Sequence, residues 1–213
     1  MTATTVSHPI FARCWGWMSP KMDAGGASDH RRRLLAGLTG EVIEVGAGNG
    51  LNFAYYPAQV IRVLAVEPEA HLRELAVRSA AKASVRIDVV DGVADRLPAS
   101  DGSADGVVLS LMLCSVPIQA IALREAHRVL RPGGQLRFFE HVRAETAALA
   151  RVQRALDATV WPALGGGCHT SRDTAGAIED AGFVIEELDR FRFPDVRLSM
   201  PTSPHILGVA RRP

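Results

Sequence analysis

A short segment at residues 41–45 (EVIEV) runs directly into the glycine loop 46–50 (GAGNG). The β-branched residues favour a strand, and the closely spaced glycines let the backbone turn tightly where that strand ends. A strand, a glycine loop and a helix in this order begin many doubly wound parallel sheets, which bind ligands beyond the carboxyl ends of their strands. The loop therefore predicts an α/β fold with a ligand site at residues 44–50.

The rest of the chain alternates short apolar segments with helical patterns, as parallel strands joined by crossover helices do. The expected strands lie at 41–45, 61–66, 85–90, 105–111, 135–140, 183–188 and 205–210. Apolar residues at helical spacing, with proline and glycine at the ends, predict helices over 72–80, 117–130, 149–160 and 170–181. The strands are short and mostly apolar, so we expect both faces of the sheet to be covered.

A length of 213 residues with 47% hydrophobic content suits one domain with one sizeable core. We expect a single domain over residues 1–213. Within it, residues 161–204 would form loops and a helix on the substrate side, and residues 1–28 an N-terminal cap. The cap is expected to be irregular apart from a short helix that carries Phe11, Trp15 and Met18.

Charge and cysteine content exclude some classes of function. The 24 basic and 23 acidic side chains leave a formal net charge of +1, so no overall field attracts nucleic acid or an anionic membrane. Cys14, Cys114 and Cys168 lie far apart without metal-ligand spacing, which predicts a reducing compartment and no metal site. No stretch resembles a signal peptide or a membrane span. We expect a soluble, cytoplasmic protein, and the sequence leaves its oligomeric state open.

Two acidic residues and one leucine discriminate between nucleotide ligands. In a dinucleotide-binding loop the third glycine would fall at position 51, which is Leu51. Glu44, just before the loop, would repel a pyrophosphate but suits a ligand that carries an ammonium and a sulfonium. Glu67, at the end of the next strand, can accept hydrogen bonds from two ribose hydroxyls of either ligand. The pattern indicates an adenosine cofactor and favours one without phosphate.

Further motifs accompany the glycine loop: residues 97–98 (LP), 113–116 (LCSV), 128–134 (RVLRPGG) and 140–142 (EHV). With them the chain resembles, over residues 31–213, the class I methyltransferases, which use S-adenosylmethionine. A similarity to the thiol S-methyltransferases within that class rests on Trp161, Gly167, Cys168, Thr170, Arg172 and residues 204–206 (PHI). Ubiquinone and menaquinone C-methyltransferases are broader relatives by resemblance.

The resemblance implies a Rossmann-like, mostly parallel sheet of seven strands in the order 3-2-1-4-5-7-6, with strand 7 antiparallel and helices on both faces. S-adenosylmethionine would lie across the ends of strands 1, 2 and 4 and leave as S-adenosylhomocysteine. Where many members have an adenine-binding aspartate, this chain has Val93, so the backbone of Val93 and Ala94 takes over that contact, with Asp95 nearby. The implied cofactor-binding residues are Glu44, Gly46, Ala47, Gly48, Asn52, Glu67, Pro68, Val93, Ala94 and Leu111.

Methyl transfer needs alignment more than acid–base chemistry, because the cofactor supplies an activated methyl group. A thiol, with a pKa near 8.5, needs little help to ionise, whereas an alcohol needs a true base. Candidate bases are few in this chain, so a thiol or an acidic phenol is the favoured small-molecule acceptor. His141, after the fifth strand, is the candidate base, with His169 and His205 behind it.

The candidate substrate residues are Trp15, Trp161, Cys168 and His169. Other side chains have structural interpretations: Cys114 lies in an apolar segment and is expected to pack in the core. The aromatic side chains at 191 and 193, with Met18, would either wall a pocket or pack in the core. The three arginines at 31–33 point in different directions on a helix, which indicates a solvated face.

Other functional classes remain open at this stage. Amino-methyltransferases of nucleic acids carry an Asn/Asp-Pro-Pro-aromatic motif after strand 4, where this chain has residues 111–114 (LMLC), so a base amine is a poor candidate acceptor. A nicotinamide-dependent oxidoreductase is disfavoured by Leu51 and Glu44. The remaining alternative is a protein that binds S-adenosylmethionine without catalysing transfer.

Overall fold

The computed structural model describes residues 9–159, 161–194 and 200–213. The first half of the chain comprises α1 (Pro9–Met22), η1 (Asp23–Ala27), α2 (Ser28–Leu35), β1 (Gly40–Val45), η2 (Phe53–Tyr55), β2 (Val60–Val66), α3 (Ala70–Ala80), β3 (Arg86–Val90) and β4 (Ala104–Ser110). The second half comprises α4 (Gln119–Val129), β5 (Leu130–His141), α5 (Ala147–Asp157), α6 (Trp161–Leu164), α7 (Thr174–Asp180), β6 (Val184–Arg192) and β7 (Pro204–Arg211).

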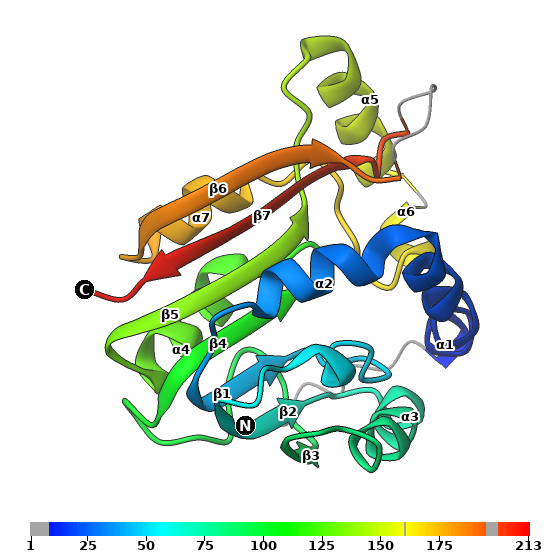
Figure 1. Ribbon diagram of the computed structural model, residues 1–213. Coiled ribbons are helices and arrows are strands. Elements are labelled where there is room, and N and C mark those ends of the chain that lie inside the picture. The colour runs from blue at the N-terminus through cyan, green and yellow to red at the C-terminus, as the bar shows by residue number, and fades with distance from the viewer. Residues whose placement is uncertain (1–8, 160, 195–199) are drawn as a thin grey trace.

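The strands form one seven-stranded sheet in the order β3-β2-β1-β4-β5-β7-β6, which confirms the expected topology. β1 pairs in parallel with β2 and with β4, and β4 pairs in parallel with β5. β7 runs antiparallel to both β5 and β6. The carboxyl ends of β1, β2, β4 and β5 therefore lie along one edge of the sheet, where α1 and α6 are also found (Figure 1).

Alternating side chains along the central strands divide the core into two layers. In β4, Val107 and Leu109 pack on one face with α4 and α7, while Val108 packs on the other face with α2 and α3. Phe138 and Phe139 of β5 divide in the same way. Successive side chains of a strand point to opposite faces, so a mostly apolar strand supplies both layers. The prediction of a sheet covered on both faces is confirmed, with α2 and α4 on opposite sides (Figure 1).

The N-terminal region departs most from expectation. The expected helix with Phe11, Trp15 and Met18 is present but longer than expected, as α1 over residues 9–22. The chain then continues through a kink at Gly26, whose φ is +112°, into α2. Glycine tolerates this left-handed conformation, which a side chain would strain. The prediction of a largely irregular cap is therefore wrong for the described part of residues 1–28.

Two other segments differ from their sequence patterns. β5 begins at Leu130, five residues before the expected start at 135, with a register shift against β4. α5 is present, but its buried residues are Ala150 and Gln153, and Val152 of the expected apolar stripe is 49% exposed. The last residue of that stripe, at position 160, lies outside the described residues. Among the described helices, none is both long enough and apolar enough to span a membrane.

Candidate active site

The glycine loop after β1 adopts a conformation that requires glycine. Gly46, Gly48 and Gly50 all have positive φ, at +70°, +58° and +78°. A Cβ on Gly46 would lie 2.9 Å from Cβ of Met112, so the loop packs closely against the turn that follows β4. The loop is thus held between the ends of β1 and β4, where the sheet order changes direction and ligands of this fold class bind.

The backbone N–H groups of this loop donate hydrogen bonds to residues at the end of β2. The N–H groups of Gly46 and Ala47 both donate to the carbonyl of Val66, at 2.8 and 3.1 Å. The N–H of Gly48 donates to Oε2 of Glu67 at 2.7 Å. Three donors that would cradle a phosphate in a phosphate-binding loop are therefore already used within the protein.

Glu44 is a buried carboxylate with two neutral partners. Its Oε1 accepts a hydrogen bond from Nδ2 of Asn52 at 2.8 Å, and its Oε2 accepts one from the Tyr56 hydroxyl at 2.7 Å. Burial raises the pKa of Glu44 to about 7, while these two hydrogen bonds act in the opposite direction. A nearby cation would stabilise the ionised carboxylate, since burial without an opposite charge penalises it.

Arg31 belongs to the same network, which corrects the expectation of a solvated face. It is 7% exposed, its Nε contacts Oδ1 of Asp23 at 2.8 Å, and its Nη1 donates to Oδ1 of Asn52 at 2.8 Å. Arg31 therefore links the kink after α1 to the side chain that contacts Glu44. Its neighbours Arg32 and Arg33 are exposed, as expected.

Glu67 lies at the end of β2 with both carboxylate oxygens engaged by the backbone. Oε2 accepts from Gly48 N–H, and Oε1 accepts from Glu69 N–H at 2.9 Å. Burial raises its pKa, and the two backbone hydrogen bonds partly offset that effect. Each oxygen retains further acceptor capacity, which is what contact with a ribose hydroxyl requires.

These groups fit S-adenosylmethionine better than a phosphorylated nucleotide. Two carboxylates, Glu44 and Glu67, lie at the ends of adjacent strands, and residues 41–61 contain no lysine or arginine. The remaining expected cofactor residues lie along the same edge of the sheet. Pro68 follows Glu67 directly, and Leu111 follows the end of β4. Val93 pairs with Arg96 in an isolated bridge after β3, and Ala94 is partly buried beside it.

The turn after β4 is strained at Leu111, which has a φ of +56° although it is not a glycine. Glu140, fully buried in β5, stabilises this turn. Its Oε1 accepts from the N–H groups of Met112 and Leu113, both at 2.9 Å, and its Oε2 accepts from that of Cys114 at 3.2 Å. Burial raises the pKa of Glu140 to about 7 in spite of the three hydrogen bonds. The carboxylate thus fixes the backbone that carries Cys114.

Cys114, His141 and Cys168 meet at the carboxyl ends of β4 and β5, although the sequence separates them widely. Their potential ligand atoms all lie within 4.8 Å of one another, and Sγ of Cys168 is 3.7 Å from Nδ1 of His141. Cys114 is 2% exposed and Cys168 6% exposed, whereas His141 is only partly buried. The burial expected for Cys114 is confirmed. Its thiol, however, lies beside two other potential metal ligands and does not pack only against apolar side chains.

The surroundings of Cys168 favour its thiolate. The Cys114 thiol, hydrogen-bonded to Cys168, lowers the pKa of Cys168, and the His141 imidazole and the Trp161 indole act in the same direction against burial. That hydrogen bond, with burial, raises the pKa of Cys114. Trp161 and Cys168, both expected near the substrate, are therefore neighbours.

The loop with Cys168 is tied to the turn with Cys114. The N–H of His169 donates to the carbonyl of Cys114 at 2.8 Å, and Nη1 of Arg172 donates to the carbonyl of Leu113 at 2.6 Å. Nδ1 of the His169 ring is 2.8 Å from the carbonyl of Gly167 and 3.3 Å from Nη2 of Arg172. His169 thus contributes to the site through its backbone.

His205 packs beside His141, with ring centroids 4.5 Å apart. Its Nδ1 lies 2.8 Å from the carbonyl of Ser203, and its Nε2 is buried without a hydrogen-bond partner. Burial, followed by the charge of His141, lowers the pKa of His205 to about 3. The Phe191 ring stacks on the His205 ring, and the Phe193 ring meets it edge-on. Both phenylalanine rings also contact His30 of α2, so they pack between the sheet and that helix.

Helix α1 covers the glycine loop. Nε1 of Trp15 would lie 3.8 Å from a Cβ on Gly48, and Oγ of Ser19 accepts from Nδ2 of Asn49 at 3.0 Å. Trp15 is therefore brought to the cofactor loop, while Met18 is exposed on the same helix. The helix closes one side of the candidate site.

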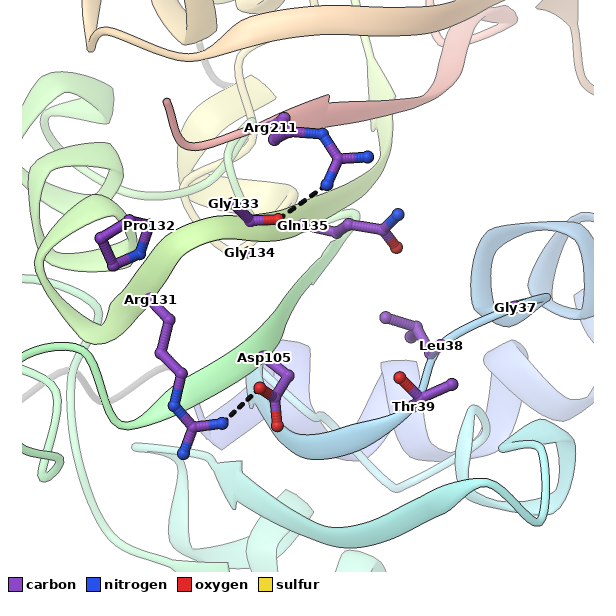
Figure 2. A pocket seen from close by; sticks show the side chains of 10 residues that line it. All are labelled: Gly37, Leu38, Thr39, Asp105, Arg131, Pro132, Gly133, Gly134, Gln135 and Arg211. Carbon is purple, nitrogen blue, oxygen red and sulfur yellow. Dashed lines mark hydrogen bonds and ion pairs between the residues drawn. The ribbon is translucent and has the colours of Figure 1, made fainter.

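A separate cavity of ≈ 300 Å³ lies at the opposite edge of the sheet, where β4 and β5 begin (Figure 2). Figure 2 shows that Arg131 pairs with Asp105 and that Arg211 donates to the carbonyl of Gly133. The charged groups there already have partners, and ligands of parallel sheets bind at the other edge. The candidate active site is therefore the region of the glycine loop and the Cys114–His141–Cys168 cluster.

Sequence reasoning missed Arg31, Tyr56 and Glu140 as members of this site. Arg31 is one of three adjacent arginines, a pattern typical of surfaces. Glu140 does directly precede His141 at a strand end, and a carboxylate in an otherwise apolar strand was an available signal.

Comparison with known proteins places these features in a family. The model of a methyltransferase domain matches residues 43–138. The thiol S-methyltransferase TMT1B of Homo sapiens is 36% identical over 182 residues, which cover 83% of this chain and 73% of that protein.

Solved structures share the fold at lower identity. An S-adenosylmethionine-dependent methyltransferase from Mesorhizobium loti has a TM-score of 0.68 and 21% identity, over 90% of this chain and 100% of that one. The [4+2]-cyclase SpnF has a TM-score of 0.70 and 20% identity, over 89% of this chain and 81% of that one. A methyltransferase and a cyclase thus share this architecture, so the reaction must be argued from the site and the sequence relatives.

Proposed function

The chain belongs to the S-adenosylmethionine-dependent methyltransferases, and we propose that it transfers the methyl group to the sulfur of a small thiol. The observation that carries the proposal is the Cys114–His141–Cys168 cluster beside the glycine loop. The name of the 36% identical relative, a thiol S-methyltransferase, supports the same acceptor class.

We propose that the two carboxylates contact different parts of the cofactor. Glu44 would face the methionine end of the cofactor, which is cationic. Burial disfavours the ionised form of the Glu44 carboxyl group, and a nearby cation would stabilise that form. Glu67 would accept hydrogen bonds from the ribose hydroxyls. The backbone of Val93 and Ala94 would contact the adenine, and Trp15 would cover the loop from α1.

The electrostatics at the cluster suit a sulfur nucleophile. The groups that favour the thiolate of Cys168 are first the Cys114 thiol and then His141 and Trp161. They would also favour ionisation of an acceptor thiol placed beside them. An alcohol would need a stronger base, and the His205 imidazole, with a pKa lowered to about 3, is a poor one.

The reaction balances with the loss of one proton. The acceptor sulfur forms a bond to the methyl carbon, the bond from that carbon to the sulfonium breaks, and its electron pair stays on S-adenosylhomocysteine. The thiol proton leaves before or during transfer. His141 was expected as the base; since its Nδ1 faces Cys168 at 3.7 Å, we propose that it acts as part of the cluster.

The test is methyl transfer from labelled S-adenosylmethionine to matched panels of small thiols, phenols and quinols. The full chain, Cys168→Ser and the control Cys14→Ser, whose cysteine is exposed on α1, would be compared. We expect labelled thioethers with the full chain and with Cys14→Ser, and at least a tenfold loss of kcat with Cys168→Ser.

Two results would contradict the proposal. Label that appears only on phenols or quinols would assign a different acceptor class. Cofactor binding measured by equilibrium dialysis, without label on any acceptor, would favour a protein that binds the cofactor and does not transfer its methyl group. Dialysis with NAD(P) serves as the control for cofactor identity.

A further inference from the structure

The Cys114–His141–Cys168 cluster has the composition and spacing of a metal site. Its three donor atoms lie within 4.8 Å of one another, and the sulfur of Cys168 is 3.7 Å from Nδ1 of His141. Tetrahedral zinc, with Zn–S near 2.3 Å and Zn–N near 2.0–2.1 Å, holds its sulfur and nitrogen ligands about 3.5–3.8 Å apart. The separation of 3.7 Å between this sulfur and nitrogen therefore leaves room for one ion between these side chains.

We propose that Cys114, His141 and Cys168 bind one zinc ion whose fourth position accepts the sulfur of the methyl acceptor. Two thiolates and an imidazole form a soft ligand set that zinc prefers and that Mg²⁺ or Ca²⁺ does not. Three protein ligands with one open position are the arrangement of a catalytic zinc site, whereas a structural site is closed by four. The role of the open position depends on the proposed thiol acceptor, whereas the binding of zinc is independent of it.

The protein holds the ligand-bearing segments in place before any metal arrives. Glu140 binds the backbone N–H of Cys114, and the Cys114 carbonyl accepts from His169 N–H at 2.8 Å. Arg172 adds a bond to the carbonyl of Leu113 at 2.6 Å. Such outer contacts orient metal ligands and raise metal affinity.

Burial and charge also suit this assignment. Cys114 and Cys168 are nearly inaccessible to solvent, while His141 is partly exposed. A metal ion could therefore reach the cluster from the side of His141. Two thiolates and one divalent cation sum to zero charge, which avoids an uncompensated charge in a buried position. The sequence could not predict the site, because each ligand comes from a different segment and His141 and Cys168 are 27 residues apart.

With zinc in place, the acceptor thiol would lose its proton to water as its sulfur takes the fourth position. The thiolate would then form the bond to the methyl carbon, the sulfonium–carbon bond would break with its electrons on the departing sulfur, and the neutral thioether would leave the ion. No oxidant or reductant is consumed.

The test is zinc uptake by the purified full chain, without cofactor or acceptor. Reduced protein would be loaded with zinc, dialysed, and analysed for metal per chain by mass spectrometry. We expect about one zinc per chain in the full chain and in Cys14→Ser. Cys114→Ser, Cys168→Ser and His141→Gln should each weaken zinc affinity by at least 10–100-fold, the range produced even by loss of outer contacts. Cobalt substitution should give a sulfur-to-metal charge-transfer band that Cys14→Ser keeps and Cys168→Ser loses.

Zinc content equal in the full chain and in Cys168→Ser would overturn the proposal. So would a Cys114–Cys168 disulfide, detected as a loss of two hydrogen masses, in a protein that takes up no zinc after reduction. Thiol methylation at an undiminished rate after zinc removal would overturn the role of the ion while leaving the proposed function intact. One zinc per chain with no methylated thiol would leave the metal site standing and refute the thiol acceptor.

Discussion

Glu140 accepts a hydrogen bond from the backbone N–H of Cys114, so a buried carboxylate of β5 holds the turn that carries a cluster cysteine. The same carboxylate binds the two preceding N–H groups, at Met112 and Leu113. This clamp lies directly after Leu111, whose positive φ is strained for a residue with a side chain. The clamp therefore explains how an unfavourable turn persists at the point where the cofactor loop meets the cluster.

Glu140→Ala should destabilise the fold by about 3–5 kcal/mol, because three buried N–H groups lose their acceptor. Glu140→Gln retains one acceptor oxygen and should cost less, about 1–2 kcal/mol. Urea unfolding followed by circular dichroism measures both. Turnover should follow the same order while cofactor affinity changes little, since Glu140 acts on the cluster side. Equal stability of the alanine and glutamine variants would show that the three bonds do not hold the turn.

Glu67→Ala should lower the affinity for S-adenosylmethionine by about 10–100-fold, since hydrogen bonds to a charged group contribute roughly 1.5–3 kcal/mol each. Part of this loss would come from the Gly48 N–H, which Glu67 holds in the loop. Titration calorimetry with cofactor measures the change. Glu74→Gln, an exposed carboxylate of α3, is the matched control and should bind normally. Unchanged affinity of Glu67→Ala would remove Glu67 from the cofactor site.

The strands and the edge of the sheet that carries the glycine loop could be predicted from sequence because their signals are local. β-Branched runs, the glycine loop and the acid at Glu67 are each visible within a few adjacent residues. The order of strands beyond the first unit came from the resemblance, since no local pattern determines which strand pairs with which. The boundaries of β5 were missed because residues 131–134 (RPGG) look like a turn, yet they lie within the strand as it shifts register against β4.

The buried polar contacts could not be predicted, because they join residues that are distant in the chain. Arg31 meets Asn52, 21 residues away, and Cys168 meets His141, 27 residues away. Adjacent arginines look identical in sequence, and only the packing of α2 against the glycine loop decides that Arg31 faces inward. The same reason hides the cluster, whose side chains meet only after β4, β5 and the loop before α7 have packed.

Arg31→Met should destabilise the fold by about 3–5 kcal/mol, the usual cost of removing one partner from a buried ion pair, here with Asp23. It should also weaken cofactor binding, because Asn52 loses the contact that orients it toward Glu44. Arg32→Met is a control on the same helix. Its ion pair with Asp29 has side chains 60% and 77% exposed, so its loss should change stability by less than about 1 kcal/mol. Similar unfolding midpoints for the two variants would argue that Arg31 is solvated after all.

Glu44→Gln should change how stability depends on pH. The pKa of Glu44 is raised in the folded protein from 4.5 to about 7, so the folded state binds this proton more tightly than the unfolded chain does. The stabilisation is therefore complete below pH 4.5 and is lost as the pH rises toward 7, a change of about 3 kcal/mol. Glutamine stays neutral at every pH and can keep its contacts with Asn52 and Tyr56. The Glu44→Gln variant should therefore not lose this stability as the pH rises.

The informative quantity is the difference in unfolding free energy between Glu44→Gln and the unmodified chain at each pH. Glu140 titrates with the same sign in the same pH window, and His205 with the opposite sign between pH 6.5 and about 3. Both groups are present in the two proteins, so their contributions cancel in the difference. The difference should grow in favour of Glu44→Gln from pH 4.5 to 7. A difference in unfolding free energy that does not change with pH would mean that Glu44 is ionised over the whole range. In that case Arg31, which contacts Glu44 through Asn52, would stabilise the carboxylate without cofactor.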